Sequence, residues 1–96
     1  MVAFAPPWTN AHRVSKYGAL CDYLVAVDLP VITVSFAEVG EIVGGLPTSA
    51  YDHAAWWSNE ASGTRHVQSE SGWMAAGYRV ERADLLGRRV TFRRDD

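Results

Sequence analysis

The chain has 96 residues, of which 48% are apolar and 21% charged, and its formal net charge is −2 at pH 7. This length predicts one domain with a single modest core and leaves no room for a second. No segment reaches the roughly 18 consecutive apolar residues of a membrane-spanning helix. The first residues lack the pattern of a secretory signal, and the single cysteine, Cys21, cannot form an internal disulfide. We therefore expect a cytoplasmic protein that does not contact a membrane.

The residue types of metal sites and active sites are present, but they do not occur in recognised spacings. Cys21 and the scattered histidines His12, His53 and His66 do not match a zinc-ligand pattern. Gly44-Gly45 lacks the lysine of a phosphate-binding loop. The pattern predicts a protein that is not an enzyme and has no metal or cofactor.

The first part of the chain predicts an irregular segment followed by a helix. Residues 1–14 contain Pro6-Pro7 and no periodic pattern, so we expect an irregular lead, with one α+β domain over residues 15–96. Ser15 is placed to cap a helix that ends at Val27. The apolar stripe of this helix consists of Tyr17, Leu20, Cys21 and Leu24, and it predicts that Cys21 is a buried structural thiol.

A strand and a second helix follow. The β-branched run Val31–Val34 predicts a strand. Ser35 and Glu38 form the pattern of a capping box at the start of a helix over Phe36–Val43. Gly44-Gly45 is expected to end that helix, because glycine readily adopts a left-handed conformation.

The stretch LPTSAYDHAAWWSN, from Leu46 to Asn59, contains two adjacent tryptophans. We expect one helix over Ser49–Ser58 with Ser49 as its N-cap. Adjacent helical side chains point about 100° apart, so Trp56 and Trp57 cannot both face the core. One of them is expected to anchor the core, and the other to lie at its edge or on the surface.

The last third of the chain predicts a helix and a β-hairpin. The helix is expected over His66–Ala76, and the strands over Tyr78–Asp84 and Arg89–Arg94. Val90 and Phe92 alternate with polar residues, which predicts one buried face and one arginine-bearing face. The expected core residues are Leu20, Leu24, Phe36, Val39, Ile42, Trp73, Val80, Val90 and Phe92.

The order of these elements predicts the fold class. Two short helices joined by a turn with glycines are typical of a helix-turn-helix. With the C-terminal hairpin, the order resembles a winged helix that has acquired one extra helix. The sequence thus predicts an α+β fold with a helix-turn-helix core.

Charge is distributed unevenly along the chain. The segment from Tyr78 to Arg94 contains six arginines and two acidic residues, Glu81 and Asp84, so its net charge is +4. The segment from Met1 to Thr64 has a net charge of −4. The asymmetry is equally compatible with a solvated hairpin that uses arginine for solubility. Together with the order of the elements and the paired tryptophans, it favours binding of nucleic acid, DNA more than RNA. The tryptophan-bearing helix would read or stack on bases, and the hairpin would contact phosphates. The candidate contacts are Tyr51, His53, Trp56, Trp57, Asn59, Arg65, His66, Arg88, Arg89 and Arg93.

A second hypothesis uses the same stretch differently. An exposed patch around Trp56 and Trp57 with charged neighbours is also typical of a protein–protein interface. The chain would then be a regulatory or antitoxin-like partner of another protein, or would form a homodimer. One observable separates the two hypotheses. Arginines and the non-core tryptophan on one face would favour nucleic acid, whereas a neutral, flat tryptophan face would favour a protein partner.

Several motifs together resemble an uncharacterised bacterial domain family. They are Lys16-Tyr17 with Leu20 and Tyr23-Leu24, Ser35-Phe36 with Glu38 and Ile42, Leu46-Pro47, Ser49-Ala50, Ala55-Trp56-Trp57 with Asn59, Trp73 with Ala76-Gly77, and Val90 with Phe92 and Arg94. The resemblance extends over residues 16–94. Gly18-Ala19 and Tyr78 depart from the pattern of the family. The resemblance supports the fold and implies no activity.

Overall fold

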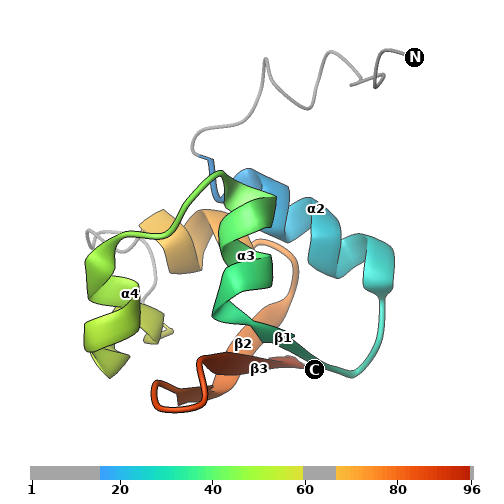
Figure 1. The fold of residues 1–96 in the computed structure, drawn as a ribbon. Coiled ribbons are helices and arrows are strands. Elements are labelled where there is room, and N and C mark those ends of the chain that lie inside the picture. Colours follow the sequence, from blue (N-terminus) through green and yellow to red (C-terminus); the bar gives the residue numbers. More distant parts are fainter. Residues whose placement is uncertain (1–15, 60–66, 96) are drawn as a thin grey trace.

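A computed structural model describes residues 16–59 and 67–95 of the chain (Figure 1). The described elements, in chain order, are α2 (Gly18–Val27), β1 (Val31–Ser35), α3 (Phe36–Val43), α4 (Thr48–Asp52), the 3₁₀ helix η1 (Ala54–Trp57), the π-helix η2 (Gln68–Trp73), β2 (Tyr78–Asp84) and β3 (Arg89–Arg94). The α+β class and the C-terminal hairpin are confirmed. The expected irregular lead over residues 1–14 lies outside the described residues. The expected start of the first helix at Ser15 is wrong, because α2 begins at Gly18 with Tyr17 as its N-cap and without a side-chain cap.

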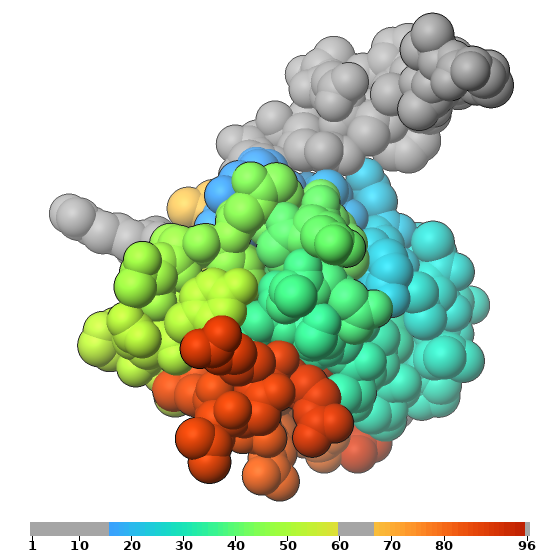
Figure 2. Space-filling view, viewed as in Figure 1, coloured from blue at the N-terminus to red at the C-terminus, as the bar shows by residue number. Residues whose placement is uncertain are grey.

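The strands form a three-stranded antiparallel sheet in the order β1-β3-β2. β3 is therefore the central strand: it pairs with β2 in the hairpin and with β1 from the first half of the chain. The helices lie together on one side of this sheet, so the described fold has two layers (Figure 1). At one end of the sheet the hairpin turn packs beside α3 and α4 (Figure 2).

The expected capping box joins β1 to α3 without a loop. The Ser35 hydroxyl accepts a hydrogen bond from the backbone N–H of Glu38 at 3.0 Å. The Glu38 carboxylate accepts one in return from the backbone N–H of Ser35, also at 3.0 Å. Two otherwise unpaired N–H groups are satisfied in this way, which fixes where the helix starts. Gly44 ends α3 with a φ of 85°, as predicted.

The core lies between the sheet and the helices. Seven of the nine expected core residues are buried, but Ile42 and Val80 are half-buried at its margin. Six further apolar residues are buried that the list of expected core residues omits, although one of Trp56 and Trp57 is expected to anchor the core: Ile32, Val34, Val43, Ala50, Trp57 and Tyr78. Ile32 and Val34 belong to the core because β1 pairs with the central strand β3.

The expected continuous helix over Ser49–Ser58 is wrong. The chain forms the short helix α4, becomes extended at His53 (φ −132°, ψ 118°), and then forms η1. Helix α4 begins after Pro47 without a side-chain cap, so Ser49 is not the N-cap. The indole N–H of Trp57 donates to the carbonyl of Ala50 at 2.8 Å. This bond satisfies a carbonyl that the early end of α4 would otherwise leave unpaired.

The expected α-helix over His66–Ala76 is also incorrect in type. Its first residue lies outside the described residues, and Gln68–Trp73 forms a π-helix, with the N–H of Met74 bonded to the carbonyl of Ser69 at 2.9 Å. Tertiary contacts favour this wider turn: the side chain of Gln68 donates to the carbonyl of Trp56 at 2.9 Å. A Cβ atom at Gly72 would lie 3.6 Å from the carbonyl oxygen of Tyr17, so a small residue allows α2 to pack closely here.

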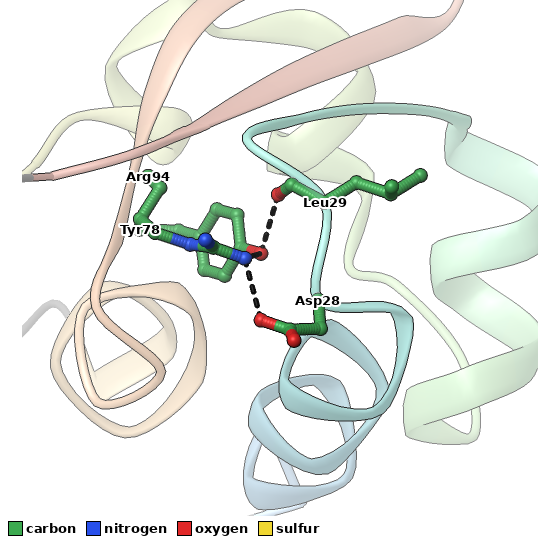
Figure 3. A network of polar contacts seen from close by, with 4 residues as sticks. All are labelled: Asp28, Leu29, Tyr78 and Arg94. Carbon is green, nitrogen blue, oxygen red and sulfur yellow. Dashed lines mark hydrogen bonds and ion pairs between the residues drawn. The ribbon is translucent and has the colours of Figure 1, made fainter.

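A polar cluster connects one end of the sheet, where β2 begins and β3 ends, to the segment after α2 (Figure 3). The Tyr78 hydroxyl donates to the carbonyl of Leu29 at 2.6 Å. The Arg94 guanidinium donates to Asp28 at 2.6 Å and to the Tyr78 hydroxyl at 3.1 Å. The partly exposed ion pair contributes little by itself, but the three contacts together fix the end of the sheet against the helical layer.

No helix within the described ranges is both long and apolar enough to cross a bilayer.

The position of Phe92 gives a direct test of the core. Phe92 is fully buried on the central strand, and its ring centroid lies 5.7 Å from that of Trp73. Replacing Phe92 by Ala should lower the free energy of unfolding by about 3–5 kcal/mol, because a large cavity remains. Urea denaturation followed by tryptophan fluorescence measures this change. Leu86→Ala is the control, because Leu86 is 98% exposed, and a change as large as that of Phe92→Ala would contradict the described core.

Candidate nucleic-acid interface

The two adjacent tryptophans lie on the helical side of the sheet. Trp57 is 1% exposed and stacks on Phe36, with ring centroids 4.8 Å apart. It also stacks on Trp73 at 5.9 Å. Trp56 is half-buried and contacts Tyr17 and Trp57 edge-on, at 5.8 and 4.7 Å. Trp57 is thus the core anchor that the sequence left undecided, and Trp56 is the residue at the edge.

The side-chain amide of Asn59 is hydrogen-bonded within the protein. Its carbonyl oxygen accepts from the indole N–H of Trp73 at 2.9 Å and from the backbone N–H of Val80 at 2.7 Å. Its amide nitrogen donates to the carbonyl of Val80 at 3.0 Å. The side chain therefore holds β2 against the tryptophan cluster. These bonds give Asn59 a structural role, and its contact with a nucleic acid stays a prediction.

The hairpin turn is connected to α4 through Arg88 and Tyr51. The Arg88 guanidinium lies over the half-buried Tyr51 ring, 5.3 Å from its centroid. The backbone carbonyl of Arg88 accepts from the N–H of Phe36 at 2.9 Å. These contacts place the turn beside the end of α4 (Figure 2). The structure therefore brings together two of the expected contact residues, Tyr51 and Arg88.

The side of the sheet away from the helices, here called the outer face, carries the remaining arginines of the hairpin. Val90 and Phe92 point toward the core, so Arg89, Thr91 and Arg93 point outward. Directly paired residues of antiparallel strands point to the same face. The pairing gives three outward rows: Val31–Arg93–Arg79, Thr33–Thr91–Arg82 and Ser35–Arg89–Asp84.

A β-bulge places Arg82 on this face. The register of β2 shifts between Val80 and Arg82, so Glu81 is the extra residue. Strict alternation along β2 would have placed Arg82 on the same side as Val80, toward the core. The bulge moves Arg82 opposite Thr91 instead. Sequence analysis missed both Arg79 and Arg82, although Arg79 could have been found from alternation with the buried Tyr78.

Three arginines of the outer face form no ion pair with another described residue, although Asp84 lies directly opposite Arg89. Arg93 is paired with Glu81 at 2.9 Å, whereas Arg79, Arg82 and Arg89 form no ion pair within residues 16–59 and 67–95. Arg79 also lies directly opposite Arg93, an unfavourable arrangement of like charges.

The two layers differ in charge. Residues 16–59, which include α2, α3 and α4, contain five acidic residues and only Lys16 as a lysine or arginine. The strands of the hairpin carry the arginines. The outer face is therefore the basic side of the described structure, and the layer that contains Trp56 is acidic. The arginines of the outer face and the non-core tryptophan lie on opposite sides of the sheet, so the shared face that would favour nucleic-acid binding is not present in the described structure. The layer around Trp56 is acidic, so it is not the neutral face expected for a protein partner either.

Other candidate residues are not part of this face. His53 is exposed between α4 and η1, and Arg65 and His66 lie outside the described residues. Cys21 is half-buried rather than buried, and burial, followed by the charge of Asp22, raises the pKa of its thiol. A raised pKa leaves less thiolate at neutral pH, which does not suit a nucleophile. Within the part of the chain that the structure describes, His, Cys, Asp and Glu side chains form no cluster that could hold a metal.

Comparison with known proteins identifies the class of the chain as an uncharacterised domain family. The family model, a domain of unknown function named DUF7662, matches residues 17–96. The chain therefore belongs to the DUF7662 family, which confirms the resemblance seen in the sequence. No curated protein and no solved structure matches the chain.

The bonds of Asn59 predict a strong effect on stability. Asn59→Ala removes the acceptor of two N–H groups, those of Trp73 and Val80. Each buried donor left unpaired costs about 1–3 kcal/mol, so the free energy of unfolding should fall by about 2 kcal/mol or more. Urea denaturation measures this fall, and loss of the downfield shift of the Trp73 indole proton in NMR spectra reports the broken bond.

The neighbouring residue Ser58 provides the control for this substitution. Its hydroxyl bonds to the carbonyl of Ala55 on an exposed part of η1, so Ser58→Ala should change stability by less than about 0.5 kcal/mol. Equal effects of the two substitutions would show that Asn59 does not have the structural role described here.

Proposed function

We propose that the protein binds nucleic acid, and duplex DNA in particular, through the outer face of the sheet and the adjacent hairpin turn. The observation that carries the proposal is the set of arginines on the outer face, Arg79, Arg82 and Arg89, which form no ion pair within the described residues. Arginine forms charge-assisted, bidentate hydrogen bonds to phosphate. An open sheet face with several such groups is suited to a polyanion.

The proposal changes the role of the tryptophans. Trp57 is enclosed by other rings and bonded through its indole N–H, so stacking on a base would require it to leave the core. Trp56 is half-buried on the acidic side. We therefore assign binding to the hairpin and assign the tryptophans to stability.

The order of the elements supports contact near the hairpin turn. The order is helix, strand, two helices, the short helices η1 and η2, and a hairpin, with β1 beside β3. Apart from η1 and η2, this arrangement is compatible with a winged helix. In DNA-binding proteins of the helix-turn-helix class a helix enters the major groove while other groups contact the backbone. Helix α4 spans only Thr48–Asp52 and contains no lysine or arginine. The hairpin would therefore supply most of the phosphate contacts.

The choice of duplex DNA follows from the residues of the outer face. Single-stranded RNA is usually held by bases stacked on exposed aromatic side chains. None of the residues in the three outward rows is aromatic. The proposal includes a cytoplasmic location, which suits the single cysteine.

Binding of a protein partner is the alternative. It requires an exposed aromatic patch at Trp56 and Trp57, and the burial of Trp57 removes half of that patch. A protein partner would be indicated if the chain bound no nucleic acid at low salt.

The double variant Arg82→Gln, Arg89→Gln tests the proposed face. Both residues are exposed on strands, so folding should be preserved. We expect weaker binding to duplexes of any sequence. The slope of log K against log salt concentration should become less steep by about 2, because each lost phosphate contact lowers counterion release by about one ion. Fluorescence anisotropy with a labelled duplex at several salt concentrations measures both effects.

A control with the same change in net charge is available on α2. Val25 and Ala26 are exposed in the acidic layer, and Val25→Glu with Ala26→Glu also makes the chain more negative by two charges. This control should retain the wild-type salt slope. If both double variants bind alike, the arginines do not contact phosphate and the proposed face is wrong.

A further inference from the structure

The hairpin tip, residues 85–88, presents a completely exposed leucine. Leu86 is 98% exposed, the highest value among the exposed large apolar residues of the described structure. A single exposed leucine on a surface is ordinary. The apex of a hairpin, however, is normally occupied by glycine or short polar residues. The surroundings of Leu86 therefore decide whether its position has a function.

The tip is held firmly in its conformation. The Asp84 carboxylate accepts a hydrogen bond from the N–H of Gly87 at 2.9 Å, across a turn with the Asp-x-x-Gly order typical of type I turns. A Cβ atom at Gly87 would lie 2.5 Å from a carboxylate oxygen of Asp84, so a larger residue there would have to displace this carboxylate. Arg88 adopts a left-handed conformation with a φ of 55°, which is unfavourable for a residue with a side chain.

Contacts with two helices hold the last residue of the tip. The carbonyl of Arg88 accepts from the N–H of Phe36, the first residue of α3, and its guanidinium lies over Tyr51 of α4. The tip therefore does not swing independently of the body. Leu86 projects from a rigid support, while Arg82 and Arg89 on the two adjoining strands have no ion pair within the described ranges.

We infer that the hairpin tip is an apolar wedge that enters the minor groove of duplex DNA and places Leu86 against a base step. Leucine is among the side chains that proteins insert between base steps from the minor groove. Arg82 and Arg89 would bind phosphates beside the insertion, which supplies the charge complementarity. This inference rests on the proposed function and adds to it a groove, a contact residue and a deformation of the DNA.

The wedge has a direct optical test. The probe is a duplex of about 20 base pairs with a central TA step, which is easily unstacked, and 2-aminopurine replaces the adenine of that step. Binding of the wild-type protein should raise 2-aminopurine fluorescence. Leu86→Gln should weaken binding by about 10-fold or more, because burial of the leucine side chain is lost. It should also abolish the fluorescence rise and leave the salt slope unchanged.

Leu29→Gln is the matched control. Leu29 is 54% exposed at the opposite end of the sheet, and its side chain points away from the polar cluster (Figure 3). This control should bind and unstack the probe as the wild type does. The variant Arg82→Gln, Arg89→Gln retains Leu86, so it should still raise the 2-aminopurine fluorescence when its concentration is high enough to saturate the duplex.

The outcomes separate the two proposals. If Leu86→Gln retains both the affinity and the fluorescence rise, the wedge is refuted while binding through the arginines stands. If the wild type binds no duplex at low salt, both proposals fail. Sedimentation with vesicles that contain phosphatidylserine tests whether the tip binds a lipid surface instead. If the protein binds these vesicles in a way that depends on Leu86, and does not bind DNA, the wedge is overturned.

Discussion

The ring stack of Phe36, Trp57 and Trp73 is the interaction on which the rest of the structure depends. It joins α3, η1 and η2 on one side of the sheet, and Phe92 of the central strand packs against Trp73. Its polar edges are satisfied as well, because the indole groups of Trp57 and Trp73 donate to Ala50 and Asn59. Buried aromatic side chains contribute more apolar area than any others. A small domain that places two tryptophans in its core gains stability that its length would not otherwise provide.

This stack also determines which surfaces are available for binding. Because the helices cover the inner face of the sheet, the polar positions of β2 and β3 point away from them. The arginines consequently gather on the outer face, and the acidic residues of α2 and α3 remain in the other layer. The hairpin turn joins the two layers, since Arg88 contacts both Phe36 and Tyr51. The fold thus separates a basic face from an acidic layer and places a rigid turn at their boundary.

Local signals in the sequence were sufficient for some parts of the fold. The capping box at Ser35 depends on residues three apart, and the alternation around Val90 and Phe92 depends on neighbours, so both were predictable. Three features arise from contacts between distant segments. The break at His53 follows from the docking of Trp57, the π-helix of η2 from packing against α2 and Trp56, and the outward position of Arg82 from a bulge. The candidate site was only partly predictable for the same reason: Arg88 and Arg89 follow from the hairpin, but Arg82 and the structural role of Asn59 require the register of β2.

We propose that the outer face and the hairpin tip, not the tryptophan cluster, form the binding surface. NMR chemical-shift mapping of the labelled protein during titration with a short DNA duplex at low salt tests it most directly. We predict that the largest shifts occur at the backbone amides of Arg82, Leu86 and Arg89, while the indole signals of Trp57 and Trp73 stay unchanged. Large shifts at Trp56 and Tyr17, with none along β2 and β3, would contradict the account.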